Sequence, residues 1–208
     1  MTRILIADDH DVVRSGLRSI LEPRWQVVAE AANGREAVRR AIELKPDVAV
    51  LDYSLPLING VEATRQIRAR VPTVEVLIFT MHDSEELIRD LLEAGARGYL
   101  LKSDAKGFLV NAIESLAAHR PYFTARVSET LLESYLTRAP TTPTTLTSRE
   151  RSVVQLIAEG HSNKQIASIL SISVKTVETH RASAMRKLNV SSAAALVRYA
   201  VRNKIVEA

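Results

Sequence analysis

Ile4-Leu-Ile-Ala-Asp-Asp-His10 consists of four apolar residues followed directly by two carboxylates and a histidine. A short apolar run that ends abruptly in polar residues is typical of a strand buried on both faces of a parallel sheet. Four later runs have the same character and are interpreted as further buried strands: Gln26–Ala29, Asp47–Leu51, Val74–Phe79 and Gly98–Leu101. The two carboxylates would then lie at the carboxyl edge of this sheet, where α/β proteins bind their ligands.

Amphipathic segments separate these runs. Their apolar residues recur at the spacing of one helix face, as in Val13, Leu17, Ile20 and Leu21 and again in Ala37, Val38, Ala41 and Ile42. Pro46 ends the second of these segments. Because five strands alternate with helices, residues 1–120 are predicted to form an α/β domain of the (βα)5 type, a five-stranded parallel sheet with helices on both faces.

Residues 121–145 are expected to connect this domain to a second one. Pro121 opens the segment, and Val127–Leu136 is a candidate helix. The following Ala139-Pro-Thr-Thr-Pro-Thr-Thr145 places two prolines among threonines. This composition disfavours helix and cannot build a core, so we interpret it as a linker.

Residues 146–208 are predicted to form a small all-α domain of four short helices. Thr147-Ser-Arg-Glu150 and Ser162-Asn-Lys-Gln165 match the capping-box pattern, in which the two ends satisfy each other's free amides. Gly160 lies where a helix should end, and Ser173 and Ser191 are expected to be N-caps of the last two helices.

A helix-turn-helix is predicted within this domain. Asn163–Leu170, a three-residue turn and Val174–Leu188 have its proportions. Residues 139–208 contain 10 Lys and Arg against 4 Asp and Glu, a surplus of +6, although the whole chain carries only +4. A basic surplus around such a motif indicates double-stranded DNA as a partner, and the alternative is a basic surface that is merely solvated.

The composition argues against several other classes of protein. The 208 residues include no cysteine, which excludes disulfides, thiolate metal ligands and cysteine catalysis. The apolar runs are too short to cross a bilayer, and the N-terminal residues lack the pattern of a signal peptide. We therefore expect a cytoplasmic protein with no membrane partner.

Side chains of complementary chemistry follow four of the predicted strands: Asp8, Asp9, Asp52, Thr80 and Lys102. Because the carboxyl ends of parallel strands share one edge of a sheet, these side chains are expected to lie close together. Clustered carboxylates favour a hard divalent cation such as Mg²⁺, which offsets the charge of an incoming phosphoryl group. One carboxylate could then form an acyl phosphate, held by the ammonium and the hydroxyl. The alternative is that all five are solvated loop residues.

Several separated motifs resemble the receiver domain of two-component systems over about residues 3–119: Ile4–His10, Val50–Pro56 with Gly60, Leu77–Thr80 and Gly98–Lys102. The resemblance implies a flavodoxin-like fold with Asp52 as the phosphoacceptor. It also implies a Mg²⁺ site formed by Asp8, Asp9, Asp52 and the main-chain carbonyl of Ser54.

The same resemblance implies further roles for five residues. Thr80 and Lys102 would contact the phosphoryl group, and Tyr99 would swing inward with Thr80 on activation. Ser54 and His82 occupy positions that vary in the family and tune the lifetime of the phosphoryl group. For Tyr99 the alternative is an ordinary core aromatic.

The last domain is similar to the LuxR-type DNA-binding domain, as shown by Leu146–Arg151, Ile157–Gly160, Ser162–Ala167, Ile172–Arg181 and Met185–Leu188. The whole chain therefore resembles a response regulator of the NarL/FixJ family, a class of transcription factors. This resemblance implies a sensor histidine kinase and RNA polymerase as partners. It also implies a homodimer on DNA, to which the last helix, about residues 192–203, contributes.

The resemblance assigns DNA contacts to the helix-turn-helix. The groove-facing set is Lys175, Thr176, Glu178, Thr179 and Ala182. Candidates for contact with the DNA backbone, or for support, are Asn163, Lys164, His180, Arg181, Arg186 and Lys187. The carboxylate of Glu178 could accept a hydrogen bond from cytosine N4. For Thr176 and His180 the alternative is a role in capping or packing.

Three other functions are less well supported. An aspartyl-phosphate hydrolase commonly has a second acid two residues after its nucleophile, where this chain has Ser54. No enzymatic activity is therefore expected beyond Mg²⁺-dependent phosphorylation and dephosphorylation of the receiver itself. A DNA-binding regulator controlled by a small ligand would need a pocket domain that residues 1–120 do not resemble. The main alternative is a phosphorylation-independent DNA-binding regulator whose receiver serves as a dimerisation module.

Overall fold

The computed structural model describes residues 1–82, 84–125, 127–129, 132, 146–203 and 205–206. The chain divides into two compact units, Met1–Arg138 and Ala139–Ala208, which are described separately. The predicted linker Ala139–Thr145 lies outside the described residues. Of the candidate helix Val127–Leu136, only residues 127–129 and 132 are described, and these are helical.

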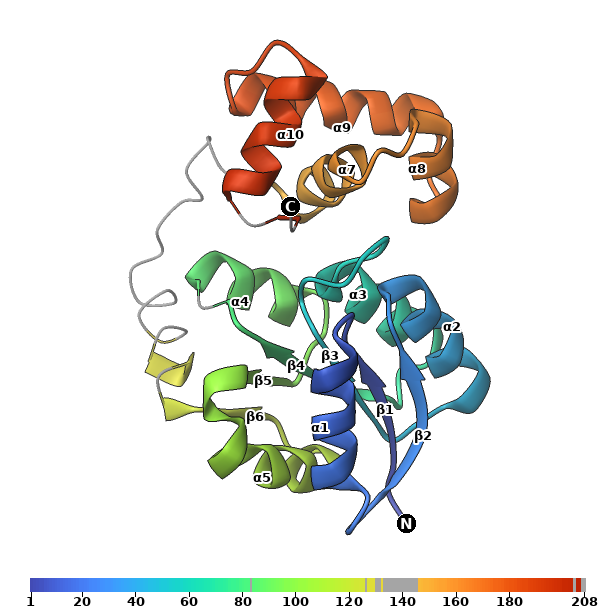
Figure 1. Cartoon of the computed structure of the whole chain (residues 1–208), viewed down its shortest axis with the longest axis vertical. Coiled ribbons are helices and arrows are strands. Elements are labelled where there is room, and N and C mark those ends of the chain that lie inside the picture. Colours follow the sequence, from blue (N-terminus) through green and yellow to red (C-terminus); the bar gives the residue numbers. More distant parts are fainter. Residues whose placement is uncertain (83, 126, 130–131, 133–145, 204, 207–208) are drawn as a thin grey trace. The chain divides into compact units, whose positions relative to one another are not determined.

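The first unit is built on a six-stranded parallel sheet in the order β2-β1-β3-β4-β5-β6 (Figure 1). The strands are β1 (Arg3–Ala7), β2 (Gln26–Ala31), β3 (Val48–Leu51), β4 (Glu75–Thr80), β5 (Gly98–Leu101) and β6 (Tyr122–Phe123). The order of the first five is that of a flavodoxin-like fold, in which the winding reverses between β1 and β3. The positions of the five predicted strands and the fold class are confirmed. The expectation that all five are buried was wrong for β2, which lies at the edge of the sheet and is mostly only partly buried.

The expected number of strands was one too few. The unforeseen strand, β6, pairs in parallel with β5 through Gly98 with Tyr122 and Tyr99 with Phe123. Two residues are too short to show a periodic pattern, and the preceding Pro121 favours a loop. Pairing with an existing sheet edge, rather than a local preference, therefore determines β6.

Helices cover both faces of this sheet (Figure 1). They are α1 (Asp11–Leu21), α2 (Gly34–Leu44), α3 (Gly60–Arg70), α4 (Glu85–Glu93) and α5 (Ala105–Ala117), with a 3₁₀ turn, η1 (Lys102–Asp104), before α5. Leu17 and Leu21 of α1 share one core with Ile113 of α5 and with Ile4 and Val50 of the sheet. The helix pairs α2–α3 and α3–α4 are in contact on the opposite face (Figure 1).

Capping side chains explain where three of these helices begin. The side chains of Asn33, Asn59 and Ser84 accept hydrogen bonds from the main-chain amides three residues later, which caps α2, α3 and α4. The apolar stripe of α1 is narrower than predicted, because Leu17 and Leu21 are buried whereas Ile20 is 43% exposed. Ile20 therefore lies at the margin of the buried face.

The described residues of the second unit form four helices: α7 (Ser148–Ala158), α8 (Asn163–Leu170), α9 (Val174–Lys187) and α10 (Ala193–Arg202). Both predicted capping boxes are present, at Thr147 and Ser162, and Ser173 caps α9 as predicted. The expected cap of α10, Ser191, was wrong by one residue. The side chain of Ser192 is the one that accepts from Ala195 N, and the two adjacent serines cannot be distinguished by residue type.

Two apolar clusters hold these helices together, and α7 contributes to both. Val154 packs with Ala184 of α9 and Leu196 of α10, whereas Leu156 packs with Ile166 of α8 and Val177 of α9. Since α9 joins both clusters, its inward face is fixed by packing and its other face is left for solvent or a partner.

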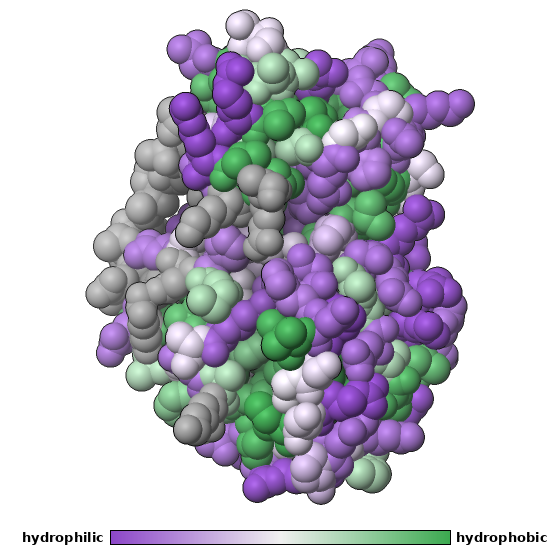
Figure 2. Space-filling model, viewed as in Figure 1, coloured by the Kyte–Doolittle hydropathy of each residue, from purple (hydrophilic) through white to green (hydrophobic). Residues whose placement is uncertain are grey.

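Hydrophilic side chains cover most of the face drawn in Figure 2, and apolar ones form smaller patches between them. Within the described residues, no helix has the length and apolar character needed to cross a bilayer.

Candidate functional site

Asp52 lies at the carboxyl end of β3 and is only 5% exposed. Its main-chain N donates to the carbonyl of Ala7 over 2.8 Å, and its Oδ1 accepts from Tyr53 N over 2.7 Å. The loop that follows is held by Gly60, because a Cβ at that position would lie 2.6 Å from the carbonyl oxygen of Asp52. Only glycine leaves room for this close approach, which fixes the start of α3 against the main chain of Asp52 and Tyr53.

One ammonium bridges two carboxylates at the same edge of the sheet. Lys102 follows β5, and its Nζ lies 2.7 Å from Asp8 Oδ2 and 3.1 Å from Asp52 Oδ2. Asp8 and Asp9 follow β1, and Asp8 is fully buried. The structure therefore brings together Asp8, Asp52 and Lys102, which lie far apart in the sequence.

The pKa values of Asp52 and Lys102 are both raised from their ordinary values. Burial raises the pKa of the Asp52 carboxyl and the nearby Asp8 raises it further, while the Lys102 ammonium opposes both. Burial lowers the pKa of Lys102, but the two carboxylates outweigh this and the net pKa is raised. Lys102 is therefore cationic, and the ionised form of Asp52 is less favourable than that of a free carboxyl. Such a group gains from a further cation or from sharing its charge in a covalent bond.

The residues present fit a hard divalent cation. Asp8 Oδ2 and Asp9 Oδ1 are buried carboxylate oxygens. Their close contacts are with charged or titratable nitrogens, Lys102 Nζ at 2.7 Å from Asp8 and His10 Nδ1 at 2.8 Å from Asp9. Carboxylate oxygens with spare lone pairs are the ligands that Mg²⁺ prefers.

His10 was not foreseen as a member of this group. Its Nδ1 and the carboxylates of Asp8 and Asp9 offer ligand atoms that all lie within 4.8 Å of one another. The signal that could have found it is its position directly after the acidic pair. The side chain is half exposed, so it lies at the rim of the site.

A second set of contacts surrounds His82, in the loop after β4. Its main-chain N donates to Thr80 Oγ1 over 3.2 Å, and its Nε2 lies 2.8 Å from Ser54 Oγ. Its ring meets Tyr53 edge-on, with the ring centroids 5.0 Å apart. The hydroxyl of Tyr99 donates to the main-chain carbonyl of His82. One residue thus joins the loops after β3 and β4 to β5.

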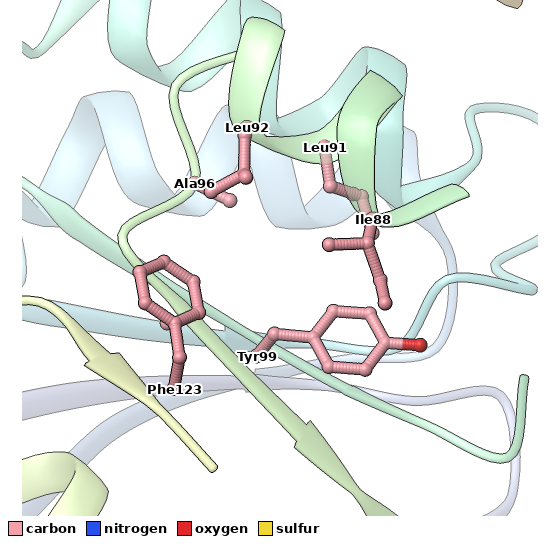
Figure 3. A pocket seen from close by; sticks show the side chains of 7 residues that line it. Ile88, Leu91, Leu92, Ala96, Tyr99 and Phe123 are labelled. Atoms are coloured by element: carbon pink, nitrogen blue, oxygen red, sulfur yellow. The ribbon is translucent and has the colours of Figure 1, made fainter. Parts of the chain in front are cut away.

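Tyr99 is turned into the protein and is only 2% exposed. Its ring lines an apolar pocket beneath α4, together with Ile88, Leu91 and Phe123 (Figure 3). In this view its hydroxyl points away from Phe123. The inward position agrees both with a switch residue and with a core aromatic.

The helix-turn-helix presents one exposed face along α9. Its exposed residues recur at helical spacing: Lys175, Glu178, Thr179, Ala182 and Arg186. Lys164 on α8 is also exposed, while Asn163, His180 and Arg181 are partly buried. The face carries positive charge at both ends and a single carboxylate between them.

Three predicted DNA-contact residues already have partners within the domain. Thr176 Oγ1 lies 2.8 Å from Ser173 Oγ, and Thr179 Oγ1 donates to the carbonyl of Lys175 over 2.9 Å. Lys187 Nζ lies 2.7 Å from Glu150 Oε2. Of the two roles expected for Lys187, this contact provides support.

Glu150 was expected only to cap α7, but it also ties α7 to α9. Besides Lys187, Ser183 Oγ donates to it over 2.7 Å and Thr147 N donates over 2.7 Å. Burial acts to raise the pKa of Glu150, yet these hydrogen bonds outweigh it and lower the pKa to about 2. The contacts with α9 depend on tertiary packing, so no local pattern signals them.

Both halves of the chain match known domain families. Residues 4–114 match the response regulator receiver domain, and residues 144–200 match bacterial regulatory proteins of the luxR family. The protein is therefore a response regulator, with a receiver joined to a DNA-binding output domain. The chain belongs to the NarL/FixJ family of response regulators, which are transcription factors.

Two of the relatives cover nearly the whole chain, and a third covers part of it. The oxygen regulatory protein NreC of Staphylococcus epidermidis is 38% identical, and the alignment covers 99% of each chain. RcsB of Salmonella enterica serovar Typhimurium, bound to promoter rprA in the presence of the phosphomimetic BeF3−, has a TM-score of 0.68 at 28% identity, covering 95% of this chain and 97% of its own. A LuxR-family regulator from Aurantimonas sp. is 41% identical with a TM-score of 0.62, covering 65% of this chain and 99% of that chain.

Proposed function

We propose that phosphorylation of Asp52 controls sequence-specific DNA binding by the C-terminal helix-turn-helix. The observation that carries this proposal is the buried Asp52 carboxylate, 3.1 Å from Lys102 Nζ and close to the further carboxylate of Asp8. The donor is a sensor histidine kinase or a small acyl phosphate. An oxygen of Asp52 attacks phosphorus, the acyl phosphate bond forms, and the bond to the donor's nitrogen or oxygen breaks.

The surrounding residues each have a part in this transfer. Lys102 is cationic and close enough to move from pairing with Asp52 to pairing with the phosphoryl oxygens. Asp8, Asp9, Asp52 and the main-chain carbonyl of Ser54 would hold Mg²⁺. When bound, the cation offsets the negative charge that accumulates between the carboxylates and the phosphoryl group.

The contacts of His82 could couple phosphorylation of Asp52 to a structural change near α4. The Thr80 hydroxyl, which now accepts from His82 N, would turn to donate to a phosphoryl oxygen. This would release one restraint on the residue whose carbonyl holds Tyr99. The result is a shift between two arrangements of the loop after β4, the aromatic side chain of Tyr99 and the adjoining surface of α4.

At the DNA, α9 would enter the major groove with its exposed face. Glu178, Thr179 and Ala182 would meet base edges, while Lys175 and Arg186 would reach phosphates. Thr176 completes the groove-facing set, and Asn163, Lys164, Arg181 and Lys187 would contact the backbone or support the helix. The complex of RcsB with a promoter in the presence of BeF3− supports this assignment by analogy. We further propose that the protein acts in the cytoplasm as a homodimer, and that it acts on RNA polymerase.

Incubation with acetyl phosphate tests the chemistry of the receiver. We expect the intact mass of the wild-type protein to rise by one phosphoryl group in the presence of Mg²⁺. With EDTA we expect no adduct, because the carboxylate cluster would then repel the incoming anion. An adduct that forms equally well in both conditions would contradict the role of the metal.

His82→Ala is expected to change the decay rate of the phosphorylated protein more than it changes folding. The substitution removes the contact with Ser54 Oγ and the edge of the ring against Tyr53, both next to Asp52. The main-chain contacts with Thr80 and Tyr99 are kept. The half-life of the phosphoryl group, followed by intact mass after removal of the donor, and the melting temperature would be compared with wild type. An unchanged half-life would refute the prediction.

Lys175→Ala and Glu178→Ala are expected to weaken DNA binding in different ways. Losing Lys175 should lower affinity for all sequences and reduce the salt dependence by about one phosphate contact. Losing Glu178 should relax preference at one base pair, by roughly 1–3 kcal/mol. Both side chains are exposed, so the fold should tolerate either change. Affinities would be measured on a selected site and on its single-base variants. An equal loss on every site for Glu178→Ala would argue against base recognition.

A further inference from the structure

The guanidinium of Arg14, on α1, contacts the turn that carries both acidic residues after β1. Its Nη1 donates to the main-chain carbonyl of Asp8 over 2.7 Å. Its Nε lies 3.3 Å from Glu30 Oε2 on β2, and its Nη2 pairs with Asp11. The side chain is only 13% exposed. Arg14 therefore joins the first turn of α1, the end of β1 and the edge strand β2.

The hydrogen bond from Arg14 to the Asp8 carbonyl orients the whole peptide between Asp8 and Asp9. The carbonyl of Asp8 and the amide of Asp9 belong to the same planar peptide. A charge-assisted hydrogen bond to that carbonyl therefore orients the peptide between the two carboxylates. The side of the turn that faces β2 is held as well, since Asp8 N donates to the carbonyl of Ala31 over 3.2 Å.

Neighbouring carboxylates outside the acidic site balance the positive charge of Arg14. Asp11 and Glu30 both pair with the guanidinium, and Glu30 Oε1 also lies 2.5 Å from Arg18 Nε. Arg14 can thus hold the turn without acting as a cation that would compete for the carboxylates of Asp8 and Asp9.

We propose that Arg14 is a positioning residue for the cation site of this receiver. It acts through the Asp8–Asp9 peptide and touches neither the cation nor the phosphoryl group. The inference rests on the proposed function of Asp8 and Asp9 as Mg²⁺ ligands. Glu30 anchors the guanidinium from β2, so that an ion pair at the edge of the sheet sets the geometry of the ligands.

The test is direct binding of a cation to the full-length protein without a phosphoryl donor. Free Mn²⁺ would be measured by electron paramagnetic resonance, and Mg²⁺ affinity by competition. Arg14→Met is expected to raise both dissociation constants about 10-fold, a typical loss when a residue that orients a metal ligand is removed. Arg14→Lys should fall between, because one ammonium can reach the Asp8 carbonyl but cannot span the same acceptors.

Arg18→Met is the matched control. It lies one turn further along α1 and pairs with the same Glu30, but no contact joins it to Asp8 among those the structure records. It should therefore keep wild-type affinity within about twofold while losing a similar ion pair. Equal affinities for Arg14→Met and wild type, or equal losses in both variants, would overturn the positioning role. Mn²⁺ binding that is undiminished in Asp9→Asn would instead overturn the proposed cation site, and the inference with it.

Discussion

Asp52→Asn abolishes the phosphoryl adduct that acetyl phosphate forms on the wild-type protein; this is the largest effect that we expect of any single substitution. The amide keeps the size of the side chain but has no nucleophilic carboxylate, so no acyl phosphate can form. The adduct would be measured as intact mass after incubation with Mg²⁺ and located by peptide mass.

Asp47→Asn is a fitting control for this experiment. Asp47 precedes the same strand, β3, at its opposite end, where its carboxylate accepts from Arg3 N over 2.7 Å. Its substitution should leave the adduct intact. A full adduct on Asp52→Asn, or a phosphoryl group located on another residue of the wild type, would contradict the assignment.

Asp52→Asn should also stabilise the receiver in the absence of metal. Burial raises the pKa of Asp52 in the folded state, so the folded state binds a proton more readily than the unfolded chain does. The ionised side chain therefore costs stability at pH 7, and this cost falls as the pH is lowered through the raised pKa. We expect a higher melting temperature for Asp52→Asn in EDTA, and a smaller difference from wild type at acidic pH. A lower melting temperature would show that Lys102 compensates the charge fully.

Glu150→Ala should destabilise the C-terminal domain by about 3 kcal/mol, which is typical of leaving the partners of a buried charged group unsatisfied. The change removes the hydrogen bonds with Ser183 and Lys187 on α9 and half of the capping box with Thr147. Hydrogen exchange in α7 and α9, measured by mass spectrometry on the full-length protein, would report the stability of this domain alone.

The pH dependence of this effect has a definite sign. The pKa of Glu150 is lowered from 4.5 to about 2, so the folded state favours the ionised form. The stability that it contributes is complete above the unfolded value and is lost as the pH falls toward about 2. Wild type and variant should therefore converge in acid. The exposed Glu178→Ala should alter protection by less than about 0.5 kcal/mol. Equal protection in all three proteins at neutral pH would contradict the account.

Most of the fold could be predicted from sequence because its signals are local. Apolar runs of the right length identify the first five strands, and capping boxes mark α7 and α8. The missed features depend on tertiary contacts or on a choice between equivalent neighbours. β6 exists because the edge of β5 is available, and Ser192 caps α10 although Ser191 has the same side chain.

In the candidate site, too, some features could be predicted from the sequence and others depend on tertiary contacts. Strand ends bring Asp8, Asp52 and Lys102 together, which follows from the order of a parallel sheet. The contacts that hold them do not follow from any pattern. Arg14 reaches the carbonyl of Asp8 only because α1 packs beside β2, and His82 meets Ser54 only because two loops converge.

On the DNA-binding face, sequence alone cannot separate residues that contact DNA from residues that support the recognition helix. The predicted set includes both the exposed Lys175 and the partly buried Lys187, which are alike in charge. Only the fold shows that the ammonium of Lys187 already binds Glu150. Exposure therefore favours Lys175, Glu178 and Arg186 as the first residues to substitute.

The most direct test of the central claim is DNA affinity with and without beryllofluoride, a mimic of the phosphoryl group. The DNA would be a site selected from a random library by the wild-type protein, and binding would be followed by fluorescence anisotropy at fixed salt. We expect beryllofluoride with Mg²⁺ to tighten binding by about 10-fold or more for wild type and to leave the affinity of Asp52→Asn unchanged. Equal affinity in both conditions for wild type would contradict it and would favour a receiver that acts only as a dimerisation module.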